Sequence, residues 1–231
     1  MPIKVAPYLS AWSYSRLSDY EECPLKAKCK HLDKIAEPGG EALERGKRIH
    51  TLAEQYTMRR LTELPPELAN FPEEFGGLRA RKDVECERQL AVNRNWQPCG
   101  WFGADAWLRI VVDVTYAGAT PDEPGRVVVD HKTGKIRVEN ASQLDLYGLV
   151  MFAYYPGIKR VDSALWYLDQ GEIVSKSLVP DEAPALRAKW EQRVAPMLAD
   201  RTFAPTPGNG CRWCFYGQSG KAKRGPGLCQ F

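Results

Sequence analysis

Apolar side chains recur every three to four residues in several parts of the chain, a spacing that predicts amphipathic helices. The clearest segment is 41–60, where Leu43, Ile49 and Tyr56 share one side of a helix. Pro24 interrupts an earlier segment, where a proline is tolerated if it begins a second helix. The segments with helical spacing are 13–32, 41–60, 139–154 and 181–200.

Runs of β-branched and alternating apolar residues predict strands between these helices. The predicted strands are 83–92, 107–116, 125–130, 161–168 and 172–178. Residues 117–124 have the Gly, Pro and Asp content of a hairpin turn, and residues 64–77, rich in Pro, Glu and Gly, predict a loop. This order of elements predicts an α/β fold with a central mixed sheet flanked by helices.

The composition is that of an ordinary globular protein, with 231 residues, 44% of them hydrophobic and 26% charged. The length suits one domain over 1–231, with an N-terminal helical part (1–60), a core (83–200) and a cysteine-rich end (205–231). No apolar run approaches the roughly 18 residues of a membrane span, and the first ten residues lack a secretory signal. We therefore expect an intracellular, cytoplasmic protein.

The net charge of +3 is small, but the charge is unevenly distributed. Residues 201–231 contain five cations and no acidic side chain. A basic tail of this kind suits contacts with nucleic-acid phosphates, and equally it can be a solvated chain end. The five cations are Arg201, Arg212, Lys221, Lys223 and Arg224.

Two predicted strands end in acidic residues. Asp113 lies near the end of one strand, and Asp130, His131 and Lys132 close the next. Carboxylates from adjacent strands can converge on Mg²⁺, which prefers oxygen ligands. Side chains alternate along a strand, so Asp130 and Lys132 share one face, where the lysine can polarise an attacking water or neutralise charge on a phosphate. The same pattern also occurs as a simple ion pair at a strand end.

Helical residues flank this strand pair on both sides in the sequence. His50 and Glu54 are four residues apart and share a helical face, one turn after Gly46. Gln143 and Tyr147 have the same spacing in the helix that follows the acidic strands. Gln143 suits a contact with a phosphate or base, and Tyr147 suits stacking or a hydrogen bond. Either pair can also be ordinary helix surface.

Taken in order, these motifs resemble the RecB-like nucleases of the PD-(D/E)XK superfamily, which include the CRISPR-associated adaptation exonucleases. The motifs are Ser13–Leu17 with Tyr20–Pro24, Gly46-x-x-x-His50, Asp113, Asp130-His131-Lys132-Thr133-Gly134 and Gln143-x-x-x-Tyr147. The resemblance implies a restriction-endonuclease-like fold and a metal-dependent exonuclease that hydrolyses DNA phosphodiester bonds. It further implies DNA as substrate, single-stranded or with free ends. The sequence has no Walker phosphate loop, so a helicase or recombination partner would be a separate protein. The alternative is a non-catalytic nucleic-acid-binding protein on the same fold.

The resemblance also implies roles for individual residues. His50, Asp113 and Asp130, with the backbone carbonyl of His131, would hold Mg²⁺ or Mn²⁺, and Lys132 would act in catalysis together with the two aspartates. Gln143 and Tyr147 would lie beside the DNA. Asp105 competes with Asp113 for the second position, and we prefer Asp113 because residues 108–112 lead into it as a strand. Glu87 is a possible additional acid, for which packing at the core edge is the expected role.

Seven cysteines form an odd number, which argues against a disulfide framework in a reducing compartment. Cys211 and Cys214 form a C-x-x-C pair, Cys229 adds a third sulfur, and Cys23 or Cys29 can supply a fourth. Four thiolates suit either a [4Fe–4S] cluster or Zn²⁺. The resembled nucleases with this feature have one cysteine before the core and three after it, binding [4Fe–4S]. This implies a cluster on Cys23, Cys211, Cys214 and Cys229, and we expect Cys86 and Cys99 to serve in packing.

Overall fold

The computed structural model describes residues 8–118, 124–218 and 226–231. The chain divides into two compact units. We call residues 39–188 the core unit, and residues 1–38 together with 189–231 the terminal unit. The middle of the expected turn over 117–124, and the cations Lys221, Lys223 and Arg224, lie outside the described residues.

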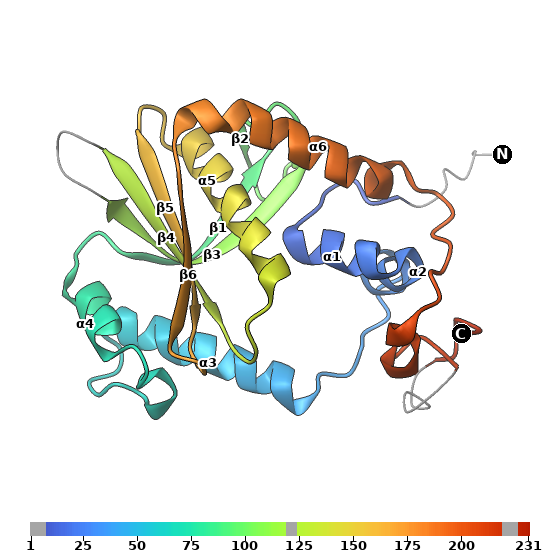
Figure 1. The fold of residues 1–231 in the computed structure, drawn as a ribbon, viewed down its shortest axis with the longest axis horizontal. Helices are drawn as coiled ribbons and strands as arrows, with labels where there is room; N and C mark the ends of the chain where they lie inside the picture. The colour runs from blue at the N-terminus through green and yellow to red at the C-terminus, as the bar shows by residue number, and fades with distance from the viewer. Residues whose placement is uncertain (1–7, 119–123, 219–225) are drawn as a thin grey trace. The chain divides into compact units, whose positions relative to one another are not determined.

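A six-stranded mixed sheet forms the centre of the core unit, in the order β2-β1-β3-β4-β5-β6 (Figure 1). Neighbouring strands are antiparallel except β4 and β5, which run parallel. A parallel pair needs a crossover, and helix α5 (Gln143–Tyr154) supplies it. The strands are β1 (Glu85–Val92), β2 (Pro98–Cys99), β3 (Leu108–Gly118), β4 (Gly125–Lys132), β5 (Arg160–Tyr167) and β6 (Glu172–Leu178).

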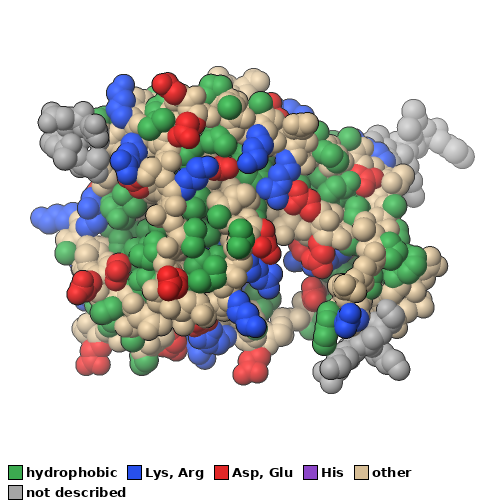
Figure 2. Space-filling model, viewed as in Figure 1, with side chains coloured by type: hydrophobic (Ala, Val, Ile, Leu, Met, Phe, Trp, Pro, Cys, Tyr) green, Lys and Arg blue, Asp and Glu red, His purple; other side chains and the backbone are tan. Residues whose placement is uncertain are grey.

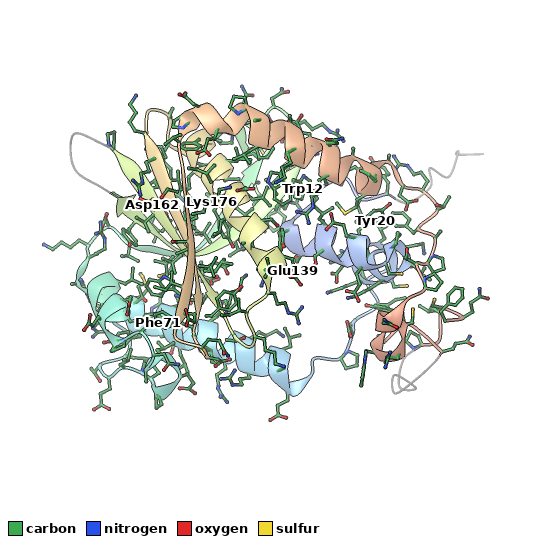
Figure 3. All side chains as sticks on the ribbon, in the orientation of Figure 1. Trp12, Tyr20, Phe71, Glu139, Asp162 and Lys176 are labelled. Carbon is green, nitrogen blue, oxygen red and sulfur yellow. The ribbon has the colours of Figure 1, made fainter. Side chains whose placement is uncertain are left out.

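Helices cover both faces of this sheet. Helices α3 (Glu41–Thr57) and α4 (Pro72–Ala80) bury one face around Trp166, whose ring lies 5.5 Å from those of Phe71 and Phe75. Figure 3 labels Phe71 in this layer. Helix α5 lies against the other face, where a Cβ at Gly148 would come within 2.7 Å of the Leu178 side chain. A larger residue at that position would push α5 away from β6.

The structure corrects one expected element. Residues 64–77, expected to form a loop, contain the 3₁₀ turn Pro66–Leu68 and the first part of α4. Pro72 occupies the first turn of α4, where a missing N–H is tolerated. Phe75 and Leu78 are buried at 0% and 3% exposure, and this burial holds a segment of weak helical sequence in a helix. The two-residue strand β2 was also not expected, because it is too short for a periodic pattern.

The terminal unit joins the two ends of the chain. It contains α1 (Tyr14–Glu22), α2 (Pro24–Ala27), a π-helical turn (Lys28–Leu32) and a 3₁₀ turn (Asn209–Trp213), and α6 (Ala183–Ala199) crosses its boundary. Trp12 stacks on Trp190 at 5.8 Å, and the Tyr20 hydroxyl donates to Asp200 at 3.0 Å (Figure 3). No helix among the described residues has the length and apolar character to cross a bilayer.

Candidate active site

Three elements of the core unit bring the predicted site residues together. His50 comes from α3, Asp113 from β3, and Asp130 from the end of β4. Val114 pairs with Val129 across the β3–β4 ladder. Asp113 and Asp130 are the next residues beyond this pair, one on each strand. A Cβ on Gly46 would lie 3.2 Å from Thr133 Oγ1, so glycine allows α3 to approach the end of β4 closely. This approach sets the His50 ring against the carboxylates.

His50, Glu87 and Asp113 form a set suited to a metal ion. One ligand atom from each lies within 4.8 Å of the other two, and His50 Nδ1 is 3.3 Å from Asp113 Oδ2. Two carboxylates and an imidazole suit Mg²⁺ or Mn²⁺, and the imidazole favours the softer of the two ions. Among the residues that the structure describes, it is the one group of three or more His, Cys, Asp or Glu side chains whose ligand atoms lie this close together.

The position of Glu87 differs from the expected packing at the core edge. Its neighbours Cys86 and Arg88 pair with Val114 and Val112, so Glu87 lies across from Asp113 on the adjacent strand. Its side chain is exposed, and its φ of +50° lies in the left-handed region that non-glycine residues rarely adopt. Such backbone strain is concentrated at functional sites. The sequence offered an acid on a strand, but its place opposite Asp113 depends on a pairing that the sequence does not state.

A chain of hydrogen bonds links the remaining site residues. Lys132 Nζ lies 2.6 Å from Asp130 Oδ2 and donates to Gln143 Oε1 at 3.1 Å. Gln143 Nε2 donates to the Tyr147 hydroxyl at 2.6 Å, and this hydroxyl donates to Asp130 Oδ1. Tyr147 is fully buried, so its hydroxyl acts inside the protein. These four residues form a closed ring that fixes the lysine and the aspartate relative to each other.

Burial and neighbouring charges set the protonation of this ring. Burial raises the pKa of Asp130 above its usual value, although Lys132 acts in the opposite direction. Burial also lowers the pKa of Lys132, but the Asp130 carboxylate outweighs it and the net shift is upward. Lys132 is therefore a protonated hydrogen-bond donor near neutral pH. This favours a role in neutralising charge over one in removing a proton.

The two histidines of the site differ in environment. Burial lowers the pKa of His131 to about 4, and its ring packs 5.3 Å from Phe75 and 5.7 Å from Trp166. Its backbone N–H donates to Asp113 Oδ2 at 2.6 Å. Burial also lowers the pKa of His50, but the Asp113 carboxylate reverses the shift and raises it overall. The His131 ring is thus a neutral core group, whereas the His50 ring lies beside the Asp113 carboxylate.

Two hollows adjoin the site. One, of about 530 Å³, is lined by His50, Glu54 and Glu87 together with Lys47, and we call it the acidic hollow. The other, of about 470 Å³, is lined by Arg45, Lys132, Lys135 and Arg137, and we call it the basic hollow. Ala42, Leu43 and Thr133 line both, so the hollows are adjacent. Together they provide open space beside His50, Glu87 and Lys132.

Comparison with known proteins identifies the family. The sequence profile of the PD-(D/E)XK nuclease superfamily matches residues 11–219. The chain belongs to this superfamily. The six-stranded mixed sheet flanked by helices is consistent with its restriction-endonuclease-like core. No curated protein matches the chain.

One solved structure supports this fold, and a second matches more weakly. A candidate exonuclease from Eubacterium rectale superimposes on this PD-(D/E)XK protein with a TM-score of 0.52 at 13% identity, covering 90% of this chain and 88% of that one. The crystal structure of SSO0001 matches with a TM-score of 0.45 at 12% identity, covering 95% of this chain and 90% of that one. At 13% identity, the likeness to the candidate exonuclease shows a shared fold alone.

A second cluster in this PD-(D/E)XK protein lies in the terminal unit. Cys23, Cys211, Cys214 and Cys229 all line one cavity of about 130 Å³. Cys29, the alternative to Cys23, is buried at 2% exposure and is not among the residues lining the cavity. These four cysteines come from both ends of the chain. Burial raises the pKa of Cys29, and Cys214 and Cys229 also contribute to this rise, so the identity of the fourth ligand stays a prediction.

Backbone N–H groups approach the sulfur atoms of this cluster. The N–H of Thr206 donates to Cys23 Sγ at 3.5 Å, and that of Gly208 donates to Cys211 Sγ at 3.3 Å. Burial raises the pKa of Cys214, against the effect of backbone N–H groups directed at its sulfur. Hydrogen bonds to sulfur stabilise thiolate ligands in metal clusters. Cys86, by contrast, packs against the hydrophobic core and its pKa is raised to about 12 by burial.

Proposed function

We propose that this protein is a divalent-metal-dependent deoxyribonuclease that removes nucleotides from DNA ends. The observation that carries the proposal is the convergence of His50, Glu87 and Asp113, beside a lysine held by Asp130 and Gln143. Membership of a nuclease superfamily supports the reaction class. The fold shared with a candidate exonuclease is compatible with action at ends. A role in recombination, repair or mobile-element DNA processing, with a helicase as a separate partner, belongs to the same proposal.

The donor set fits Mg²⁺ or Mn²⁺, because it combines carboxylate oxygens with one imidazole nitrogen. His50, Glu87 and Asp113 would hold the ion, with Asp130 and the His131 carbonyl as the further expected ligands. When bound, the ion would lower the pKa of a coordinated water and neutralise charge on the phosphate. The metal ligands must be deprotonated, so ion and protons compete for His50, whose pKa is raised beside Asp113.

Lys132 contributes a fixed positive charge to the reaction. Its ammonium group would donate to a phosphate oxygen as negative charge develops there. Asp130 and Gln143 hold it from two sides, so little reorganisation is needed at that moment. We assign Tyr147 a positioning role through Asp130, because its buried hydroxyl is already bonded to that carboxylate. Gln143 is only half-buried, and the expected DNA contact stays a prediction for it.

The cysteine cavity is proposed to hold a [4Fe–4S] cluster. Four thiolates around one cavity, with N–H donors on the sulfurs of Cys23 and Cys211, match the chemistry of such a site. Four thiolates also suit Zn²⁺, so metal analysis decides between the two. The group would be structural, because it ties residue 23 to residues 211–229. Its binding free energy would then contribute to the stability of the terminal unit.

Cleavage of end-labelled single- and double-stranded DNA in Mn²⁺, Mg²⁺ or EDTA tests the proposed function. We expect stepwise shortening from an end with Mn²⁺ or Mg²⁺ and none with EDTA. Comparing 5′- and 3′-labelled substrates gives the polarity, and a covalently closed single-stranded circle tests the need for an end. Absence of cleavage under all metal conditions would favour a non-catalytic nucleic-acid-binding protein.

Glu87→Gln is expected to weaken Mn²⁺ binding by at least about 10–100-fold. Loss of a residue that only supports a metal ligand already costs this much, and Glu87 is proposed as a ligand itself. The substitution removes a charged oxygen ligand but preserves the size of the side chain. Mn²⁺ binding is measured by electron paramagnetic resonance of the free ion, without DNA. Glu54→Gln is the matched control, because Glu54 lines the same hollow but does not belong to the set of three. Unchanged Mn²⁺ affinity in Glu87→Gln would exclude Glu87 as a ligand.

A further inference from the structure

The two hollows beside the reactive groups differ in charge. The acidic hollow contains Glu54 and Glu87 against a single lysine, Lys47, besides His50. The basic hollow has four cationic side chains and, among its described lining residues, no Asp or Glu. On the face shown in Figure 2, Lys and Arg side chains are interspersed with Asp and Glu. The described lining of the basic hollow lacks this mixture of charges.

Only two of the four cations in the basic hollow are available to a ligand. Arg45 is bound through both terminal nitrogens to Asp169, at 2.9 and 2.6 Å, and Lys132 is bound to Asp130. Lys135 and Arg137 are exposed, and neither makes an ion pair with a described residue. Two uncompensated positive charges thus lie in one hollow with the catalytic lysine.

The segment that carries these two cations is anchored. Asp169, which binds Arg45, also accepts the Gly134 N–H at 2.6 Å, where a φ of +83° requires the freedom of glycine. The Gln170 side chain donates to the Gly134 carbonyl at 3.3 Å. At the other end, the Tyr167 hydroxyl donates to the Arg137 carbonyl at 3.3 Å. The backbone of Lys135 is therefore held on both sides, which lowers the entropy cost of binding.

We propose that Lys135 and Arg137 form a subsite for the backbone phosphate next to the scissile one in a DNA strand. This rests on the proposed function. A phosphodiester strand repeats its negative charge. With one phosphate at the metal ion held by His50, Glu87 and Asp113, a neighbouring phosphate is attracted by the uncompensated cations of the basic hollow. The guanidinium of Arg137 can bind two phosphate oxygens, and Lys135 adds a point charge. Such contacts position a strand and carry no sequence preference.

The salt dependence of DNA binding tests this subsite. Binding of fluorescently labelled (dT)₁₂ is measured by anisotropy in EDTA over a range of NaCl concentrations. The slope of log K against log [NaCl] is negative. The double variant Lys135→Ala/Arg137→Ala is expected to reduce its magnitude by at least about 0.7, the value for one phosphate contact on a single strand. Lys82→Ala/Arg94→Ala is the matched control, because both side chains are exposed cations outside the hollow. A slope equal to that of the control would overturn the subsite.

A second measurement locates the contacted phosphate. Single-turnover cleavage is compared between DNA with an uncharged methylphosphonate next to the scissile phosphate and unmodified DNA. In wild type the modification is expected to slow cleavage at subsaturating protein, and in Lys135→Ala/Arg137→Ala it should have little further effect. If the methylphosphonate slows the double variant as much as it slows wild type, the two changes act independently. The contacted phosphate then lies elsewhere, and the proposal is overturned.

The two proposals fail in different ways. The binding slope is measured in EDTA and needs no cleavage. A reduced slope in a protein that never cleaves DNA would support a phosphate contact at Lys135 and Arg137 and contradict the nuclease proposal. Metal-dependent cleavage with a slope equal to that of the control would support the nuclease and contradict the subsite.

Discussion

Replacing Lys132 with alanine is expected to lower the rate of DNA cleavage by at least about 10²–10³-fold, the usual effect of removing one group that stabilises transition-state charge. Lys132 is fixed beside the site, bound to Asp130 at 2.6 Å and to Gln143 at 3.1 Å. Its raised pKa keeps it charged under assay conditions. Single-turnover cleavage with saturating Mn²⁺ measures the effect on the chemical step. Cleavage at the wild-type rate would contradict the assignment.

The variant needs controls for folding and for substrate binding, because Asp130 is buried. Removing its partner leaves a buried carboxylate uncompensated, which destabilises the fold or drives the group to bind a proton. Thermal unfolding reports the first effect, and (dT)₁₂ binding in EDTA reports whether the DNA site persists. Lys132→Arg keeps the charge but moves it away from the Nζ position. We expect this variant to fold like wild type and still cleave slowly. Lys82→Ala, on an exposed lysine, serves as the neutral control.

The fold was predictable where local pattern and burial agree. The runs of β-branched residues predicted five of the strands in order, and the spacing of Ile49 and Tyr56 placed α3 correctly. Leu43, predicted on the same side of that helix, is instead 54% exposed, because it lies near the start of α3, ahead of the buried residues Ile49 and Ala53.

The pattern failed at α4, because Pro72 and the neighbouring glutamates and glycines resemble a loop. There the helix depends on burial of Phe75 and Leu78 against the sheet, a tertiary effect that residue type does not reveal.

The candidate site shows the same division. The sequence selected Asp113 over Asp105 because a strand leads into it, and the structure sets Asp113 3.3 Å from His50. The sequence offered Glu87 only as a possible additional acid, because its nearness to Asp113 follows from the register of β1 against β3. Gln143 and Tyr147 share one helical face, as their spacing predicted, and their place beside the DNA stays a prediction. This face points to Asp130 and Lys132, because α5 packs on β5, the strand that runs parallel to β4.

Substituting Cys211 with serine is expected to remove the metal of the terminal unit. Protein purified without air should contain about four iron atoms per chain, with the broad visible absorbance of a [4Fe–4S] cluster, and Cys211→Ser should lose both. Cys86→Ser is the matched control, because Cys86 is half-buried against the core. Cys29→Ser separates the two candidates for the fourth ligand, and retained iron in this variant would support Cys23. Zinc in place of iron would contradict the cluster and keep the four-cysteine site.

Stability should change together with metal content if the site is structural. The cluster would join Cys23, directly after α1, to three cysteines near the chain end, so its loss leaves the terminal unit held by contacts such as Trp12 on Trp190. Structural metal sites contribute on the order of 10 kcal/mol to folding, which few contacts of this size replace. We therefore expect Cys211→Ser to show protease cleavage within residues 1–38 or 189–231, while residues 39–188 stay resistant. The same resistance in Cys211→Ser and Cys86→Ser would show that the cysteines do not hold the terminal unit together.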